Sequence, residues 1–453
     1  MKVQHPLAHR YGNSKRYSAL DADVRPREFW AWAMYDFANS GYTTVVITAL
    51  FNAYFVVEVA KNASWATFAW TSTLSASYGL VVLSAPLIGA YADLRGAKKS
   101  LLALTTAGCV VFTALLYFAQ PETLEFTVFC VVLSNFFFGT GENLIAAFLP
   151  EISNTRALGR VSGWGWSLGY IGGLITLGVC LLYVLWASAH GQTDQQFVPV
   201  TMLITAAIFA IASLPTFILL RDRAAERIQK QATITGMFEL AWSRVWNTFR
   251  HVRQFQDLYR FLICSLFYQA GIQAVITLTA VYANRAMGFT IQQTLLLVLV
   301  VNLSAAGGAL VVGHIEDRIG HVKAIAMTLV FWIAALLLAW TAHGPLLFWI
   351  AANGVGVCLG ASQSAGRALV GVLAPLSQVA ECFGLWGLSV KLASIIGPIT
   401  YGMVSWLAAG DHRLSLLITI AYFVIGLALL CGVNPKRGRR AALRADRPVR
   451  GAG

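Results

Sequence analysis

Long apolar stretches, separated by short polar breaks, recur along almost the whole chain of 453 residues. Crossing the hydrocarbon core of a bilayer takes roughly 20 apolar residues in an α-helix, because no water is available there to bond an open backbone. The stretches that meet this length lie near residues 30–57, 68–91, 100–119, 124–147, 161–187, 199–220, 258–283, 291–313, 323–342, 345–366, 382–408 and 414–432. The pattern predicts an all-α membrane protein with twelve transmembrane helices.

Basic residues are distributed unevenly between the two sides that these spans define. Lys and Arg gather in the N-terminal segment, in alternate loops, in the linker at 221–257 and in the tail, whereas the other side holds only Lys61, Arg285 and Arg413. Short loops rich in Lys and Arg stay in the cytoplasm. We therefore expect a multi-pass protein of the cell inner (cytoplasmic) membrane with both termini cytoplasmic. The net charge of +13 reflects this topology, and we expect no nucleic-acid partner.

Catalytic and metal-binding patterns do not stand out. The seven cysteines lie in or beside apolar segments without paired spacing, and the eight histidines fall in loops, tails or span edges. There is no zinc-protease motif and no phosphate-binding glycine loop followed by Lys and Ser or Thr. These observations argue against an enzyme, an ATP-driven pump, a bound cofactor and a metal site.

Two loops match each other closely in sequence: GAYADLRGAKK, which begins at Gly89, and GHIEDRIGHVK, which begins at Gly313. The corresponding glycines, aspartates and lysines are all 224 residues apart (317 − 93 for the aspartates). Each loop leaves the second helix of its half, so the spacing predicts two pseudo-symmetric six-helix bundles. Parallel repeats of this kind place a substrate site at their interface, near the middle of the bilayer.

The halves and their flanking segments divide the chain into five parts. These are a cytoplasmic N-terminal segment (1–29), an N-terminal bundle (30–220), a linker (221–257), a C-terminal bundle (258–432) and a basic tail (433–453). Apolar residues at helical spacing from Phe238 to Val252 predict an amphipathic helix on the membrane surface within the linker. The tail has no apolar periodicity and is expected to be disordered and to touch anionic lipid.

The duplicated loops predict a gate. Their glycines allow tight turns, and a carboxylate at the end of one helix can cap the backbone amides of a neighbouring helix. The gating residues expected on this basis are Gly89, Asp93, Arg95, Gly96, Lys99, Gly313, Asp317, Arg318 and Gly320. The alternative is a solvated turn whose charges only set the topology.

The same loop resembles the best-known motif of the major facilitator superfamily. Three further strings, WAWAMYDFANSGYTT, LPEISNTRALGRVSGWGWSLGYIGG and ECFGLWGLSVKLASIIGP, are similar to the vacuolar amino-acid effluxer-like branch, which contains the autophagy-related permeases and bacterial members. The resemblance implies transport and suggests amino acids. It also implies that the first, fourth, seventh and tenth spans line the central cavity.

Few ionisable residues are embedded in the spans, and such residues are functional candidates because they are costly to insert. The carboxylates are Asp36 and Glu142, and Lys391 is the only cation that we expect there. Polar residues at helical spacing extend these positions on four spans. The candidate substrate and proton-coupling residues are Asp36, Asn39, Ser40, Thr43, Asn135, Glu142, Gln269, Gln273, Asn353, Gln363 and Lys391.

Several uses of these residues remain open. Asp36 or Glu142 exchanges a proton during transport, or each belongs to a structural polar network; Lys391 attracts a substrate carboxylate, or it pairs with an acidic residue, which costs less than an unpaired ammonium. We expect a monomeric secondary transporter for an amino acid or similar zwitterion. The alternatives are a lipid or lysolipid carrier, a multidrug or sugar exporter, and a membrane sensor or scaffold that moves no solute.

Overall fold

A computed structural model describes residues 19–61, 63, 65–223, 255–287, 289, 291–407 and 412–446. Helices dominate these ranges, which contain one isolated β-bridge, between Leu20 and Ser153. The amphipathic helix predicted at 238–252 lies outside the described residues.

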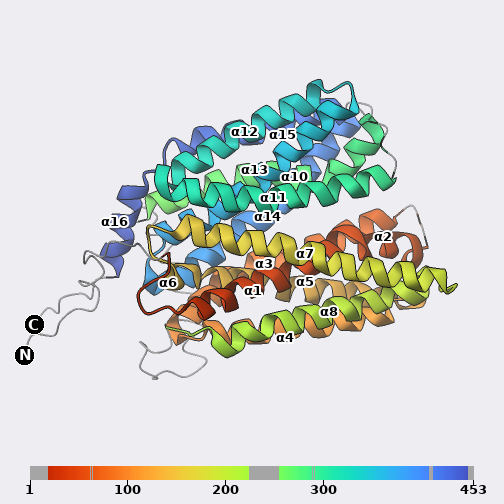
Figure 1. Cartoon of the computed structure of the whole chain (residues 1–453), viewed down its shortest axis with the longest axis horizontal. Helices are drawn as coiled ribbons and strands as arrows, with labels where there is room; N and C mark the ends of the chain where they lie inside the picture. Colours follow the sequence, from red (N-terminus) through yellow and green to blue (C-terminus); the bar gives the residue numbers. More distant parts are fainter. Residues whose placement is uncertain are drawn as a thin grey trace, which may run out of the picture.

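The first half of the chain forms one bundle, which Figure 1 shows below the second. Its helices are α1 (Pro26–Tyr42), α2 (Phe51–Tyr54), α3 (Ala66–Arg95), α4 (Lys98–Leu115), α5 (Leu124–Ala146), α6 (Leu149–Ile152), α7 (Leu158–Ala189) and α8 (Asp194–Leu219). Two π-helical segments, Thr43–Ala49 and Phe55–Val59, continue the first span beyond α1.

The second half forms the other bundle, drawn above the first in Figure 1. Its helices are α10 (Gln256–Met287), α11 (Ile291–Ile319), α12 (His321–Thr341), α13 (Pro345–Leu373), α14 (Val379–Leu407) and α15 (His412–Leu430), followed by the short α16 (Pro435–Ala445). We call the two bundles the N-half and the C-half.

The helices agree with the predicted number of spans. Among the described residues, eleven helical segments are long and apolar enough to cross a membrane. The twelfth candidate is the pair formed by α15, over Leu414–Leu430, and α16, whose axes are bent by 65°. The structure therefore confirms an all-α membrane protein with two six-helix bundles.

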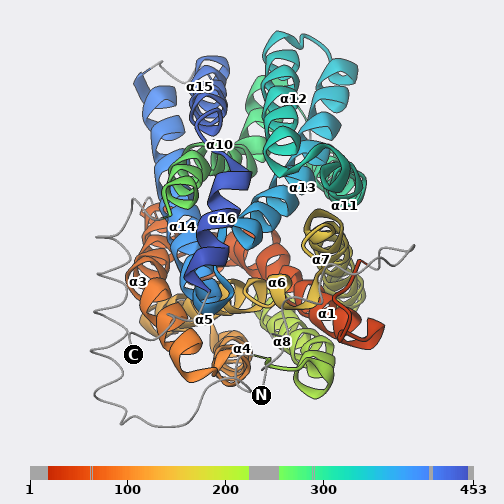
Figure 2. The same ribbon diagram turned by 90° about the vertical axis from the view of Figure 1, so that its left-hand side faces the viewer.

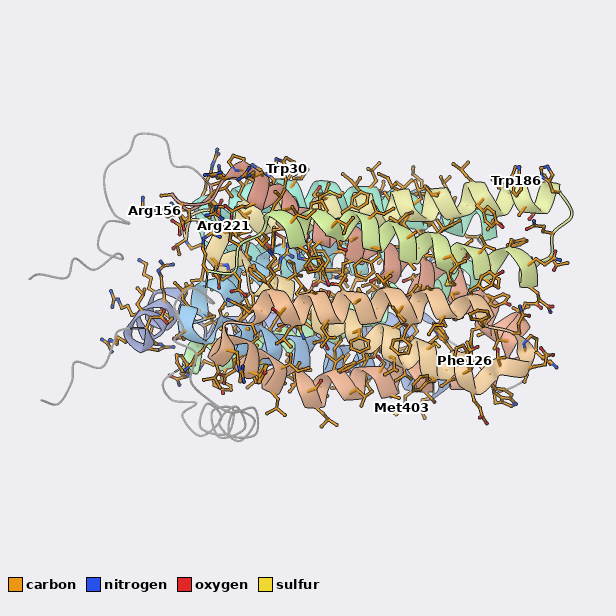
Figure 3. All side chains as sticks on the ribbon, turned by 90° about the horizontal axis from the view of Figure 1, so that it is seen from below. Trp30, Phe126, Arg156, Trp186, Arg221 and Met403 are labelled. Carbon is orange, nitrogen blue, oxygen red and sulfur yellow. The ribbon has the colours of Figure 1, made fainter. Side chains whose placement is uncertain are left out.

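Charge distinguishes the two ends of the bundles. Arg156 and Arg221 lie near Trp30 at one end, whereas Trp186 and Phe126 lie toward the other (Figure 3). The first of these ends also holds α16 and the turn between α3 and α4 (Figure 1). We call it the basic end, and the other the opposite end.

Close helix packing joins the halves. Seen from the basic end, α3 lies beside α14 and α7 beside α11 (Figure 2). A side chain at Gly89 of α3 would overlap the carbonyl of Ala380, and one at Gly163 of α7 would overlap the carbonyl of Ala309. Small residues that bring two backbones together are the usual basis of helix packing in membranes.

The tail differs from its prediction. We expected disorder from Asn434 onward, but residues 435–445 form α16. Asn434 caps the helix by accepting hydrogen bonds from the amides of Lys436 and Arg437, and Pro435 occupies its first turn. The prediction of disorder was wrong for this part of the tail, because hydrogen bonds of polar side chains hold the helix where no apolar stripe does. The chief anchor is Arg437, which donates to both carboxylate oxygens of Asp257 at 2.7 and 2.6 Å.

Candidate functional site

Two carboxylates from the duplicated loops bind the backbone of the opposite half. Asp93, near the end of α3, accepts hydrogen bonds from the amides of Ala380 (3.1 Å) and Glu381 (2.9 Å) in the first turn of α14. The first turn of a helix carries unpaired N–H groups and a partial positive charge, which favour such a contact. Asp93 therefore fastens the N-half to the C-half at the basic end.

The second carboxylate makes the reciprocal contact. Asp317 of α11 accepts from the amides of Gly159 (3.1 Å) and Arg160 (3.3 Å) in the first turn of α7. The Arg160 side chain also approaches it at 3.5 Å. The predicted capping of a neighbouring helix is confirmed at both places, and we call these two contacts the Asp93 latch and the Asp317 latch.

The other residues of the loops shape the turns. Gly96 and Gly320 have φ angles of 61° and 93°, which glycine adopts without the steric cost of a side chain. The Lys99 ammonium donates to the carbonyl of Leu220 at 2.6 Å, within the N-half. Arg95 lies over the ring of Tyr91, and Arg318 is exposed.

A buried ion pair joins the halves farther inside. The Arg367 guanidinium of α13 donates to Asp36 of α1 at 2.7 Å, and only 4% and 11% of the two side chains are exposed. Arg367 also donates to Ser162 of α7, through the hydroxyl at 3.1 Å and the carbonyl at 2.9 Å. The rings of Trp32 and Trp166 lie 4.8 and 5.4 Å from its guanidinium carbon. One cation of the C-half is thus surrounded by groups of the N-half.

Sequence reasoning missed Arg367 as the partner of Asp36. We ended the tenth span at residue 366, which made Lys391 the only expected embedded cation, but α13 continues to Leu373. This expectation was wrong because an ion pair compensates the arginine and lets the helix extend. The available signal was the position of Arg367 one turn after Gln363, on the same polar face.

A second ion pair between the halves joins the last part of α5 to the middle of α14. The Lys391 ammonium of α14 donates to Glu142 of α5 at 3.1 Å. The lysine side chain is 10% exposed and the glutamate 29%. Tyr78 and Phe138 each place a ring centroid 5.5 Å from the ammonium. Of the two predicted uses of Lys391, the structure contains the pairing with an acidic residue.

A glycine makes room for this lysine. A Cβ added at Gly139, one turn before Glu142, would lie 3.2 Å from Cε of Lys391 and 3.2 Å from a methyl group of Val81. The predicted polar face of this span thus contains a space that the lysine stem fills.

The predicted polar face of the tenth span divides in two. Gln363 accepts a hydrogen bond from Gln269 of α10 at 2.8 Å, within the C-half. Asn353 instead accepts from Ser304 of α11 at 2.6 Å. Gly356 faces the same helix, since a Cβ added there would meet the carbonyl of Val301 at 2.5 Å. The structure therefore separates Asn353 from the ion pairs.

The remaining predicted residues lie inside the bundles. Ser40 faces α7, where a Cβ added at Gly169 would lie 2.8 Å from its hydroxyl. Asn39 and Asn135 are buried, and the Asn39 side-chain oxygen and the Asn135 side-chain nitrogen have no hydrogen-bond partner among the described residues. Thr43 and Gln273 are half-buried.

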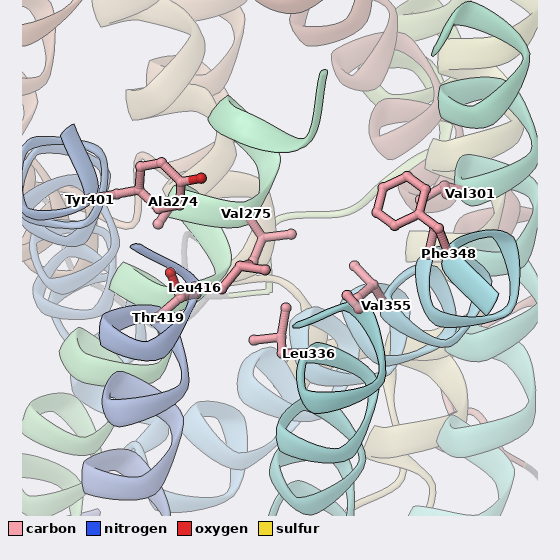
Figure 4. Close-up of a pocket in the computed structure, with 11 residues that line it drawn as sticks. Ala274, Val275, Val301, Leu336, Phe348, Val355, Tyr401, Leu416 and Thr419 are labelled. Carbon is pink, nitrogen blue, oxygen red and sulfur yellow. The ribbon is translucent and has the colours of Figure 1, made fainter. Parts of the chain in front are cut away.

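An apolar pocket lies apart from these charges, within the C-half. Its lining comes from six helices, and among the described residues that line it the polar side chains are those of Tyr401 and Thr419 (Figure 4). The residues that line it are Ala274, Val275, Val301, Leu336, Ala339, Phe348, Ala352, Val355, Tyr401, Leu416 and Thr419. Neither ion pair borders this pocket. In the described part of the chain, no group of three or more His, Cys, Asp or Glu side chains is arranged to hold a metal ion.

Known proteins resemble this chain in sequence and in fold. An uncharacterized MFS-type transporter of Bacillus subtilis, YxiO, is 26% identical over 408 residues, which cover 89% of this chain and 94% of that protein. Autophagy-related protein 22 of Kluyveromyces lactis is 22% identical over 302 residues, 62% of this chain and 59% of that protein.

Solved structures share the fold at low sequence identity. The human organic anion transporter MFSD10 has a TM-score of 0.68 and 16% identity, over 90% of this chain and 100% of that chain. The proton:xylose symporter XylE of the major facilitator superfamily, bound to 6-bromo-6-deoxy-D-glucose, has a TM-score of 0.71 and 13% identity, over 92% of this chain and 98% of that chain.

The fold and these relatives identify a multi-pass membrane transporter of the major facilitator type for a small molecule, and not an enzyme. Residues 153–443 match the family described as "Vacuole effluxer Atg22 like". The chain therefore belongs to the Atg22-like family.

Proposed function

We propose that the chain is a secondary active transporter that moves an amino acid or a similar zwitterion by alternating access and exchanges a proton in each cycle. The observation that carries this proposal is that both embedded ion pairs, Asp36–Arg367 and Glu142–Lys391, join the N-half to the C-half. Groups that hold the halves together in one conformation must find other partners when the halves separate.

The Asp36–Arg367 pair favours a proton as one such partner. Separation of α13 from α1 would leave a carboxylate in the membrane interior without its cation, which costs several kcal/mol. Protonation removes that charge. Asp36 thus takes up a proton when the pair opens and releases it when Arg367 returns, which couples the motion to a proton gradient.

The Glu142–Lys391 pair favours a zwitterionic substrate. An amino acid carries a carboxylate and an ammonium, so it can replace both partners at once, with its carboxylate on Lys391 and its ammonium on Glu142. The rings of Tyr78 and Phe138, already beside one ammonium, would also stabilise that of the substrate. The exposure of the Glu142 side chain supports access from the interior space.

The two latches supply the gate of this cycle. With both termini in the cytoplasm, as the basic loops favour, the basic end faces the cytoplasm. The Asp93 and Asp317 latches then close the cytoplasmic side, and opening requires both carboxylates to leave the helix ends that they cap.

Uptake into vesicles tests the proposal. Purified protein in liposomes is given a mixture of radiolabelled amino acids with and without a pH gradient, and we expect uptake that the gradient accelerates. Glu142→Gln and Lys391→Met should each abolish it, whereas Glu122→Gln, an exposed carboxylate at the opposite end, should not. Absence of uptake above empty vesicles would support a sensor or scaffold instead.

A charge exchange separates the binding role from a structural one. In the double variant Glu142→Lys with Lys391→Glu, an ion pair can form again in the same place. We expect this double variant to fold but not to transport, because the substrate would meet the two charges in reversed positions. Full recovery of transport would show that the pair only holds the halves together.

The apolar pocket supports a second candidate function, the transport of a lysolipid. Its lining by hydrocarbon side chains suits an acyl chain better than a free amino acid. Val355→Trp should fill the pocket, so it would stop the movement of a spin-labelled lysolipid and leave amino-acid transport intact. If neither solute responds to the substitution, the pocket has no part in substrate binding.

A further inference from the structure

The turn that binds the Asp93 latch is itself held by α16. Asp446, the residue that ends α16, accepts hydrogen bonds from the amides of Leu376 and Ser377, both at 2.9 Å, and from the Ser377 hydroxyl at 2.8 Å. These residues form the short turn between α13 and α14. Three residues later, the amide of Ala380 reaches Asp93. One carboxylate of the C-half therefore holds the turn, while one of the N-half binds the helix that follows.

The start of α16 is fixed to the same half. Asp257, at the beginning of α10, accepts from the amide of Asn434 at 2.8 Å and from the Arg437 guanidinium. Gly438 packs against the end of α13, where an added Cβ would overlap Leu373. The helix is thus attached at both ends, and Asp446 is held at a defined position beside the turn.

The N-half has an equivalent arrangement at its own latch turn. The amide of Asp21 donates to the carbonyl of Ile152 at 3.2 Å, and the amide of Asn154 donates to the carbonyl of Ala19 at 3.0 Å. These bonds flank the β-bridge between Leu20 and Ser153. The turn then leads directly into Gly159, whose amide binds Asp317. Residues 19–21, which we call the N-terminal brace, therefore fix the turn that precedes α7.

This segment is also attached to its own half. The Arg223 guanidinium, just after α8, donates to Asp23 at 3.0 Å and to Glu28 at 3.1 Å. In the C-half the matching elements are Arg437, after α15, and Asp257, at the start of α10. In each half, an arginine that follows the last span is paired with a carboxylate before or within the first turn of the first span.

We propose that Asp446 and the N-terminal brace are positioning elements, each of which holds, within its own half, the turn whose amides bind the latch carboxylate of the other half. This inference rests on the alternating-access motion proposed above. Each brace connects parts of a single half, so it stays intact while the latch beside it opens and closes. A turn held in place loses less conformational freedom when the carboxylate binds, which strengthens the latch.

A double-mutant cycle on the conformational equilibrium tests this inference. Spin labels at Arg221→Cys in the N-half and Lys323→Cys in the C-half, both exposed, report the separation of the halves at the basic end. The background is Cys431→Ser, because the other six cysteines are buried. The measured quantity is the ratio of long to short distances in the full-length protein in nanodiscs.

The two latches should respond differently to the loss of one brace. We expect Asp93→Ala to raise the ratio about tenfold and Asp446→Ala to raise it by about threefold to tenfold, since hydrogen bonds to charged groups are individually worth more than neutral ones. In the Asp93→Ala protein, Asp446→Ala should leave the ratio almost unchanged. In the Asp317→Ala protein, it should raise the ratio as much as it does in the parent. Arg444→Ala, an exposed change on the same helix, is the control and should leave the ratio unchanged.

If the Asp446→Ala protein does not fold, the N-terminal brace allows a second, independent double-mutant cycle. Asp21→Pro removes the amide that binds Ile152, and its effect should disappear in the Asp317→Ala protein and persist in the Asp93→Ala protein. Equal effects of a brace variant in both latch backgrounds would overturn the inference and leave the proposed function standing. Failure of Asp93→Ala and Asp317→Ala themselves to change the ratio would instead contradict the gate of the proposed function.

Discussion

The Asp36–Arg367 ion pair depends on the absence of a side chain at Gly165. A Cβ added at this position of α7 would lie 2.5 Å from Oδ2 of Asp36 and 2.7 Å from Nη2 of Arg367. It would also lie 2.7 Å from the ring of Trp32. The guanidinium cannot retreat freely, because it is bonded to Ser162 as well. We predict that Gly165→Ala forces the ion pair apart or separates α7 from α1.

The cost follows from comparison with a second glycine of the same helix. Overpacking a buried site costs about 1–3 kcal/mol. Alanine is favoured over glycine within a helix by about 1 kcal/mol, which offsets part of this cost. At Gly178 nothing lies within 4 Å of an added Cβ, so Gly178→Ala gains the helix preference without the overlap. The difference in unfolding free energy between the two variants therefore isolates the overlap, at about 1–3 kcal/mol.

Both variants are measured under identical conditions. Thermal unfolding in detergent, followed by tryptophan fluorescence, should give a lower apparent midpoint for Gly165→Ala than for the parent, and a midpoint for Gly178→Ala at or above the parent. Because Gly165 lies beside the charges, the same variant should also slow transport. Equal midpoints for the two variants would refute the proposed packing of α7 around the ion pair.

Three further predictions concern single positions. Gly139→Ala should slow transport but have little effect on the unfolding midpoint. The added Cβ would lie 3.2 Å from Cε of Lys391, and the flexible stem can move away only if the ammonium moves with it. Unchanged uptake kinetics would contradict this. Arg367→Met should lower the unfolding free energy by about 3–5 kcal/mol because it strands a buried carboxylate, and adding Asp36→Asn should restore most of it in chemical unfolding. Gly320→Ala should cost on the order of 1–3 kcal/mol by backbone strain at its φ of 93°, although its surroundings are open; a midpoint equal to the parent's would exclude such strain.

The duplicated loops were the most informative part of the sequence. Two aspartates at matching positions of the halves predicted contacts with neighbouring helix ends, and both latches have this geometry. The prediction succeeded because the interaction depends on local features: a glycine turn, a carboxylate one turn before it and a repeat that places the other half nearby.

The partner of Asp36 could not be derived in the same way. Arg367 is 331 residues away in the sequence, and no periodicity relates two helices of different halves. For the other pair, the sequence predicted that Lys391 pairs with an acidic residue or attracts a substrate carboxylate, but it did not identify Glu142 as the partner. Hydropathy indicates that such a residue is costly, but it does not identify the residue that compensates it.

The polar face of the tenth span shows a different limit. Helical spacing groups Asn353 with Gln363 on one side of α13, but the ten residues between them separate the two by about 15 Å along the axis and by about 80° around it. Over that distance the neighbouring element changes from α11 to α10. Periodicity predicts which residues share a face, whereas packing decides what each part of the face contacts.

The most direct test of alternating access is a pair of distances measured in the same molecule. Labels at Arg221 and Lys323 report the basic end, and labels at Glu122 and Thr341 report the opposite end. In the double variant Asp93→Asn with Asp317→Asn, we predict that the distance at the basic end lengthens while that at the opposite end shortens. Two distributions that remain single and unchanged, or that lengthen together, would contradict a rocking motion of the two halves.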